Sequence, residues 1–167
     1  MGAQLRTERL LLRPALPGDA EALHAIFVQP QAMAYWSRPP HTQIAETRDW
    51  LAGMIAIPPD QGEDFIVTLD GRVIGKAGLW RFPEIGFILD PAFWGRGYAR
   101  EALEAVIGRA FAVHRLAHVT AGGDPRQERS LALLARLGFP GTGRATRTWH
   151  VGNVWCDSVY LRLDAPR

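Results

Sequence analysis

The sequence is poor in cysteine and has no long apolar run. Its single cysteine, Cys156, excludes an internal disulfide framework and is typical of proteins in a reducing compartment. No apolar run reaches the length that a membrane span needs. Arginines interrupt the apolar residues at the N-terminus, which is unlike a secretory signal peptide. We therefore expect a cytoplasmic protein with no membrane partner.

The sequence also lacks a concentration of charge. The net charge is +2, and the basic residues, almost all arginine, are scattered without a dense run. Proteins that bind nucleic acid usually gather basic residues into a patch, so we expect no nucleic-acid partner. Hydrophobic residues make up 47% and charged residues 22% of the chain, as in an ordinary globular protein. We expect residues 1–167 to form a single domain.

Helix and strand patterns alternate in an order that predicts a mixed sheet with helices on its faces. Helical spacing of apolar residues follows the expected caps Asp19 and Thr42 and the glycine Gly97. A shorter helix is expected at 130–139, with Gly138 at its end. The β-rich ranges are 6–16, 65–80 with a turn at Asp70–Gly71, 83–91, 118–121, and 146–163 with a turn at Gly152–Asn153. This order predicts about seven strands and about four helices.

A glycine-rich turn joins a strand to a helix at 93–100, which reads FWGRGYAR. The N-terminus of a helix presents free N–H groups and the positive end of its dipole, and so binds phosphate. Gly95 and Gly97 would let a diphosphate approach the backbone, and Arg96 and Arg100 would add charge. The turn lacks the Gly-Lys-Ser/Thr of triphosphate loops, and Arg100 replaces the third glycine of the dinucleotide fingerprint. A tight turn without a ligand remains the alternative.

The segment EIGFILDPAFWGRGYAREAL, at 84–103, resembles the coenzyme-A-binding segment of the GNAT N-acetyltransferases. The segments LRTERLLLRP, DPRQERSLALLARLGF and CDSVYLRL are similar to the RimJ/RimL-like subgroup, which includes the ribosomal-protein N-terminal acetyltransferases and also enzymes that acetylate small amines. The resemblance covers about 5–163. It implies an α/β (α+β) GNAT fold with a mostly antiparallel sheet, acetyl-CoA as the acetyl donor, no metal, and direct transfer to a primary amine. Family members occur as monomers and homodimers, and both remain open.

The resemblance also implies a set of cofactor-binding residues. The pyrophosphate loop falls on Trp94 to Ala99, with Trp94 where the family pattern has Gln or Arg. The pantetheine arm would lie along the preceding strand. Gln127 stands where the family usually has Asn, three residues before the matching serine, Ser130. The full expected set is Phe87, Ile88, Leu89, Trp94, Gly95, Arg96, Gly97, Tyr98, Ala99, Arg100 and Gln127.

Acyl transfer needs a neutral amine, which favours an α-amine acceptor. Deprotonation at pH 7 costs a lysine side chain about 4.6 kcal/mol and an α-amine roughly 1 to 1.4 kcal/mol. A modest base therefore suffices for an α-amine. Glu84 is our first candidate, because the catalytic glutamate of some GNAT members occupies a matching position; a solvent-facing or salt-bridged residue is the alternative.

Two further residues are candidates for the catalytic region. Asp157 shares one side of a strand with Trp155, Val159 and Leu161, so it is either a structural buried acid or a second base. Ser130 is either a helix N-cap or a contact near the reacting groups. The following residues are more readily explained as packing than as chemistry: Tyr160, Cys156, Trp36, Trp50 and Trp80, although the tryptophans are candidates to line a substrate cleft.

Three functions remain open at this stage. The favoured acceptor is a protein N-terminal α-amine. A small amine such as an antibiotic, a polyamine or an amino acid is the first alternative, which a narrow acidic pocket would favour. A non-catalytic domain that binds acetyl-CoA is the second.

Overall fold

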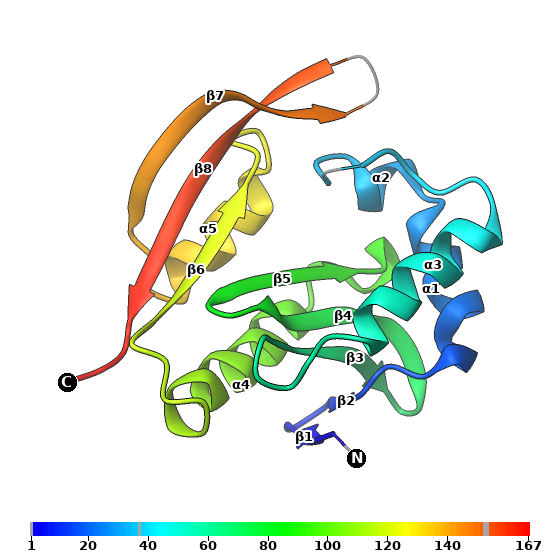
Figure 1. Cartoon of the computed structure of the whole chain (residues 1–167), viewed down its shortest axis with the longest axis horizontal. Coiled ribbons are helices and arrows are strands. Elements are labelled where there is room, and N and C mark those ends of the chain that lie inside the picture. Colours follow the sequence, from blue (N-terminus) through cyan, green and yellow to red (C-terminus); the bar gives the residue numbers. More distant parts are fainter. Residues whose placement is uncertain (1, 37, 152–153) are drawn as a thin grey trace.

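The fold is built on one eight-stranded sheet, seen in a computed structural model that describes residues 2–36, 38–151 and 154–167 (Figure 1). The strand order is β1-β2-β3-β4-β5-β6-β8-β7. The strands are β1 (Leu5–Arg6), β2 (Leu11–Arg13), β3 (Glu63–Leu69), β4 (Arg72–Arg81), β5 (Glu84–Leu89), β6 (His118–Gly123), β7 (Gly141–Val151) and β8 (Val154–Asp164). The helices are α1 (Ala20–Phe27), α2 (Pro30–Met33), α3 (Ile44–Ile55), α4 (Tyr98–Ala112) and α5 (Glu128–Arg136). Short 3-10 helices occupy Pro17–Asp19 and Pro91–Phe93.

The predicted mixed and mostly antiparallel sheet is confirmed, and two details differ. The first predicted strand is a pair, β1 and β2, joined by a turn in which the Thr7 N–H donates to the Leu10 carbonyl at 2.9 Å. The short helix α2, which begins at Pro30, had no separate signal in the sequence. A run of apolar residues cannot reveal such a turn, because both arms of the pair carry the same pattern.

The two faces of the sheet are covered by different helices. Alternate residues of a strand point to opposite faces, so β3 sends Phe65 and Val67 to the core beneath α4 and Ile66 to the core beneath α1 and α3. Ile88 of β5 joins the α1–α3 side, and Leu89 joins the α4 side. The sheet is therefore the wall between two apolar clusters, with α1 and α3 on one side of it (Figure 1).

The predicted turns at Asp70–Gly71 and at Gly138 are confirmed. Asp70 and Gly71 have φ of 50° and 80°, as a two-residue hairpin turn with two left-handed positions requires. Gly138 ends α5 with φ of 96°. The closing hairpin begins at Gly141, five residues before the predicted start, and its predicted turn at Gly152–Asn153 lies outside the described residues.

The predicted cap of α3 is wrong by one residue. The N-cap is Gln43, not Thr42. The carboxylate of Glu46 accepts the backbone N–H of both residues at 3.0 Å and the Thr42 hydroxyl at 2.8 Å. These hydrogen bonds lower the pKa of Glu46 to about 2. Asp19 is the N-cap of α1 as predicted, but its carboxylate pairs with Arg13 at 2.7 Å.

The sheet opens between β5 and β6. These two strands form the one parallel pair in the described sheet, and a single pairing, Glu84 with Thr120, joins them. Beyond that pairing the strands diverge (Figure 1). Backbone groups of β5 past this point therefore face a gap instead of a neighbouring strand. No helix in the described part of the chain is long and apolar enough to span a bilayer.

Candidate active site

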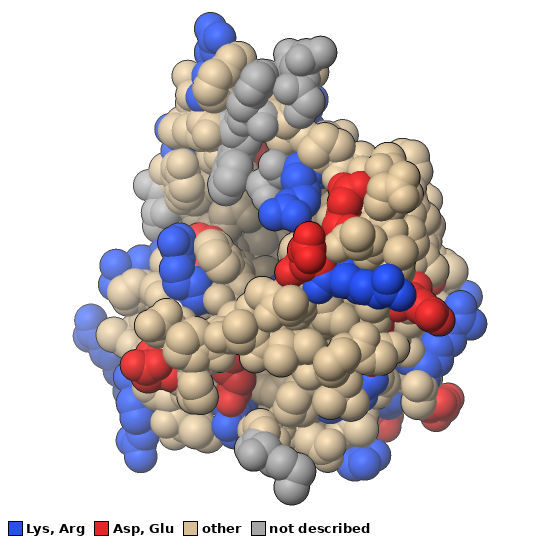
Figure 2. Space-filling model, turned by 45° about the vertical axis from the view of Figure 1, so that its right-hand side comes forward, with Lys and Arg blue, Asp and Glu red and all other residues tan. Residues whose placement is uncertain are grey.

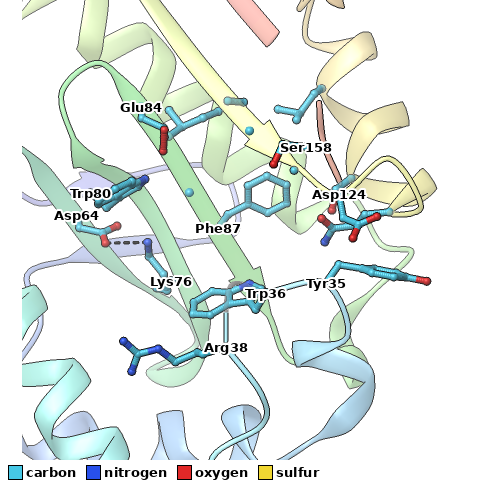
Figure 3. Close-up of a pocket in the computed structure, with 18 of the residues that line it drawn as sticks. Tyr35, Trp36, Arg38, Asp64, Lys76, Trp80, Glu84, Phe87, Asp124 and Ser158 are labelled. Carbon is cyan, nitrogen blue, oxygen red and sulfur yellow. Dashed lines mark ion pairs between the residues drawn. The ribbon is translucent and has the colours of Figure 1, made fainter. Parts of the chain in front are cut away.

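A cavity of about 700 Å³ lies where the sheet opens. Its wall is formed by the α2–α3 region, by β3 to β5 and by the start of α5 with β8. Figure 2 shows the hollow with both acidic and basic side chains near its rim, and Figure 3 shows the side chains that line it. This volume is in the range of sites that hold small molecules or chain ends.

The predicted phosphate turn has the backbone that its sequence demands. Gly95 and Gly97 have φ of 76° and 81°, and Gly97 is the N-cap of α4. Asp90 fixes the start of the turn by accepting the Ala92 N–H at 3.1 Å. The Trp94 indole N–H donates to the Leu89 carbonyl at 3.0 Å, so this side chain anchors the turn to β5.

Arg9, which lies between β1 and β2, holds the glycine turn before α4 in place. This role was not predicted from the sequence. The Arg9 guanidinium donates to the Arg96 carbonyl at 2.9 Å and pairs with Glu101 at 2.8 Å. It also lies over the Tyr98 ring, 4.4 Å from the ring centre. Only the fold brings residue 9 to residues 96–101, so local pattern could not have shown it.

The turn fits a diphosphate on geometric grounds. A Cβ added at Gly95 would meet no protein atom within 4 Å, so space is open in front of the turn. The N–H groups of the first turn of α4 have no partner within the helix and form the positive end of its dipole. Residues Trp94–Ala99, with the backbone of β5 beside the gap, would hold the pyrophosphate and the pantetheine arm of coenzyme A.

The other predicted cofactor residues are dispersed. Phe87 and Gln127 line the cavity, whereas Ile88 and Leu89 are each 5% exposed, so only their backbone could meet a ligand. Arg100 pairs with Glu104 at 2.9 Å on the surface of α4. Arg96, which is exposed, has its carbonyl bound by Arg9.

Glu84 lies in the cavity at the point where the sheet opens. It is the residue of β5 that pairs with β6, and its side chain is 31% exposed. Arg81 is 4.0 Å away, at the limit of an ion pair. The carboxylate is therefore accessible from the cavity and only weakly held (Figure 3).

Ser130 lines the cavity but is not the N-cap of α5. The cap is Gln127, and Ser130 is the third residue of the helix. The helix starts earlier than predicted because its first turn carries the polar residues Glu128 and Arg129, which mask the apolar spacing. The cap interpretation of Ser130 is thus wrong, and its place on the cavity wall remains.

Asp157 lies apart from Glu84. It lines a second cavity of about 200 Å³, which adjoins the main cavity at Asp124 and Cys156, and it accepts the Arg147 N–H at 3.0 Å. Arg147 has φ of 54°, within a register shift of the β7–β8 pair, so this hydrogen bond holds an irregular backbone. The side of β8 that carries Asp157 is not buried throughout as predicted, since Trp155 on that side is 50% exposed. Tyr160 and Cys156 line the main cavity.

The tryptophans are both packing and lining residues. Trp36 and Trp50 pack on Phe27, with ring centres 5.6 and 4.8 Å from its own, and both also line the cavity. Trp80 is 40% exposed and lines the cavity beside β5. All three therefore line the cavity, and their contact with a substrate stays a prediction.

Two ion pairs at the cavity were missed in the sequence. Lys76 of β4 and Asp64 of β3 pair at 2.7 Å with side chains 4% and 3% exposed (Figure 3). Asp124, after β6, pairs with Arg126 at 2.7 Å. Burial raises the pKa of Asp64, and the Lys76 ammonium opposes part of that rise. The Arg126 guanidinium lowers the pKa of Asp124. Both buried carboxylates therefore have a cation as partner.

The sequence model of an acetyltransferase (GNAT) domain matches residues 9–140. The chain belongs to the GNAT acetyltransferases. A relative from Bacillus licheniformis, named an uncharacterized N-acetyltransferase p20, is 31% identical over 149 residues, 83% of each chain. This GNAT protein is an acyltransferase that uses acetyl-CoA, as the resemblance implied.

Relatives with named acceptors fall into two classes. The spermidine N(1)-acetyltransferase of Escherichia coli is 25% identical, over 90% of this chain and 83% of its own. The [ribosomal protein uS5]-alanine N-acetyltransferase of Escherichia coli is 27% identical, over 98% and 91%. A structure of RimL, a ribosomal L7/L12 α-N-protein acetyltransferase in complex with coenzyme A, superposes with a TM-score of 0.85 at 18% identity, covering 97% and 98%. The GNAT fold is thus confirmed, and the relatives name two kinds of acceptor.

Proposed function

We propose that this GNAT acetyltransferase transfers the acetyl group to an N-terminal α-amine of a protein or peptide. The observation that carries the proposal is the charge of the cavity. Four of the described residues that line the cavity are carboxylates, and the two buried ones, Asp64 and Asp124, already have cationic partners. Glu84 and Asp49 remain, and the single ammonium of an α-amine acceptor needs no more than these, whereas a polycation carries several. The cavity is also wide, at about 700 Å³, where a small cation would be favoured by a narrow acidic pocket.

Glu84 is the residue we propose as the base. An α-amine needs only a modest base, and Glu84 is the carboxylate at the sheet opening that has no close ion-pair partner. It would take a proton from the acceptor ammonium through its carboxylate oxygen. Ser130 and Tyr160 line the same cavity.

The cofactor loop has a distinct task. Gly95, Gly97 and the first turn of α4 would bind the diphosphate through backbone N–H groups, which fixes the cofactor without side-chain charge. When bound, acetyl-CoA supplies the thioester carbonyl that the neutral amine attacks. Asp157, bonded to the Arg147 N–H, would support the β7–β8 hairpin instead of touching the acceptor.

A small amine is the second candidate acceptor, and the aromatic wall favours it. Trp36, Trp50, Trp80 and Phe87 line the cavity, and aromatic faces attract ammonium groups. The relative named as a spermidine acetyltransferase belongs to this class. The aromatic wall alone does not choose, because the same rings would bind an apolar N-terminal residue.

The deciding experiment is thiol release from acetyl-CoA in the presence of three acceptors. These are a peptide with a free α-amine, its N-acetylated form carrying a lysine, and spermidine. We expect release with the free α-amine peptide and none with the blocked lysine peptide. Release with spermidine alone would replace the proposal with the small-amine function.

A further inference from the structure

Lys76 is the only lysine of the sequence, since 18 of the 19 basic residues are arginine. Lysine side chains normally lie on the surface. This one is 4% exposed and lines the cavity. An ammonium is more compact than a guanidinium and has three donors that can rotate toward a partner. Its burial in a chain that otherwise uses arginine suggests that this position requires an ammonium.

Gly78 makes room for Asp64 of the Lys76–Asp64 pair, and Gly86 lies within ordinary contact distance of the Lys76 ammonium. Gly78 and Gly86 are direct partners in the β4–β5 ladder. A Cβ at Gly78 would lie 2.5 Å from Asp64 Oδ1, and one at Gly86 would lie 3.6 Å from Lys76 Nζ. The ammonium therefore lies between Asp64 of β3 and the backbone of β5, the strand that borders the gap in the sheet.

Stability does not explain the pair. Removing two charges from water costs several kcal/mol per ion, and an apolar pair of similar volume is often as stable or more so. A buried ion pair that lines a cavity can instead bind a ligand that enters the cavity. Among the described residues Asp64 is the partner of Nζ, at 2.7 Å, which leaves donor capacity for an oxygen atom of a ligand.

Glu84 and the Lys76 ammonium lie at neighbouring positions along one face of β5. Glu84 and Gly86 are two residues apart on that strand, roughly 7 Å, and alternate residues share a face. Lys76 lies over Gly86. In an α-amine acceptor the nitrogen and the first carbonyl oxygen are three bonds apart. An acceptor whose amine faces Glu84 can thus direct its carbonyl oxygen toward Nζ.

We propose that the Lys76 ammonium, held by Asp64, hydrogen-bonds the first carbonyl oxygen of the acceptor and so selects amines that lie next to a carbonyl group. This inference rests on the proposed α-amine acceptor. A polyamine has no such oxygen, and its further ammonium groups are repelled by Lys76 and cannot accept its hydrogen bonds. Lys76 is thus a specificity residue for the acceptor class.

The first test observes binding directly. Because Lys76 is the only lysine, protein labelled with ¹⁵N-lysine gives one side-chain ammonium signal. We expect that signal to shift when a peptide starting with alanine is added. A peptide starting with γ-aminobutyrate, whose amine is three methylenes from the carbonyl, should leave it unmoved. No shift with the alanine peptide, or equal shifts with both, would overturn the inference.

The second test compares the same two peptides kinetically, with rates expressed per neutral amine. The double variant Asp64→Asn with Lys76→Met should lower kcat/KM for the alanine peptide by about 10- to 100-fold, chiefly through KM, the range for one hydrogen bond to a charged group. It should leave the γ-aminobutyrate peptide unchanged. The matched control is Glu63→Gln with Arg109→Met, which removes an ion pair between the β3 residue next to Asp64 and α4. Neither residue of this pair lines the cavity, so the ratio of kcat/KM for the two peptides should stay at its wild-type value.

The outcomes separate the inference from the proposed function. Thermal melting and acetyl-CoA affinity establish that the double variant is folded. If the wild type acetylates the alanine peptide and the double variant keeps the wild-type ratio of kcat/KM for the two peptides, the inference about Lys76 is rejected and the proposed function stands. Wild-type activity on spermidine alone would reject both.

Discussion

The cofactor side and the acceptor side of the candidate active site differ in which groups they present, backbone groups on one and side chains on the other. On the cofactor side, a turn with two left-handed glycines and the start of α4 present backbone groups. On the acceptor side, side chains from strands and helices far apart in sequence converge on a cavity. Backbone geometry is dictated locally by glycine positions, whereas the acceptor side depends on contacts such as that between Asp64 and Lys76. We propose that the first side binds acetyl-CoA and that the second selects the acceptor.

The largest effect we expect from breaking the acceptor side is on stability. Lys76→Met leaves Asp64 buried without its cation, so unfolding free energy should fall by about 3–5 kcal/mol near neutral pH. Because burial raises the pKa of Asp64, the loss should shrink as pH falls and the carboxyl becomes neutral. Urea denaturation at pH 7.5 and pH 5 measures both effects.

The control for this prediction is an exposed pair. Arg100→Ala breaks the surface pair with Glu104, whose members are about half exposed, and should cost less than about 1 kcal/mol. The added change Asp64→Asn should restore much of the stability lost in Lys76→Met. Equal losses in the single and double variants would mean that the charge of Asp64 is not the cause.

Breaking the cofactor side should leave the fold intact and cost affinity instead. Gly97→Glu places a carboxylate and a strained φ of 81° at the expected diphosphate site, so acetyl-CoA binding should weaken by about 3 kcal/mol. Calorimetry measures it. Gly108→Ala, inside α4 where a Cβ meets nothing within 4 Å, should bind normally and gain up to about 1 kcal/mol of stability. Unchanged affinity in Gly97→Glu would refute the phosphate-turn assignment.

This contrast also explains what could be predicted from the sequence. Gly95, Gly97, the Asp70–Gly71 turn and Gly138 were predicted because positive φ leaves a local signature in glycine and Asp-Gly. The brace from Arg9 and the Lys76–Asp64 pair were missed, because their partners meet only in the folded sheet. Of the two interpretations of Ser130, the cap failed because a helix end can vary by a few residues without changing its apolar pattern.

The next effect tests the boundary between the two sides, where Glu84 lies. Glu84→Gln should lower kcat by about 100-fold, or about 2.7 kcal/mol, the lower end for loss of a general base. It should also change the shape of the pH–rate profile and leave acetyl-CoA affinity unaltered. Asp49→Asn, on the exposed α3 wall of the same cavity, is the control for loss of a lining carboxylate. A profile of unchanged shape would exclude Glu84 as the base.

The smallest expected effect is at Asp157, which sharpens the comparison by showing where the acceptor side ends. Asn can still accept the Arg147 N–H but without charge, so Asp157→Asn should cost at most about 1 kcal/mol of stability. The melting temperature should fall while kcat of the folded enzyme is retained, because Asp157 lines the smaller, adjoining cavity and is not among the residues that line the main one. A fall in kcat at unchanged melting temperature would instead place Asp157 among the reacting groups. The acceptor side would then extend through β8 to the smaller cavity, and a base other than Glu84 would have to be considered.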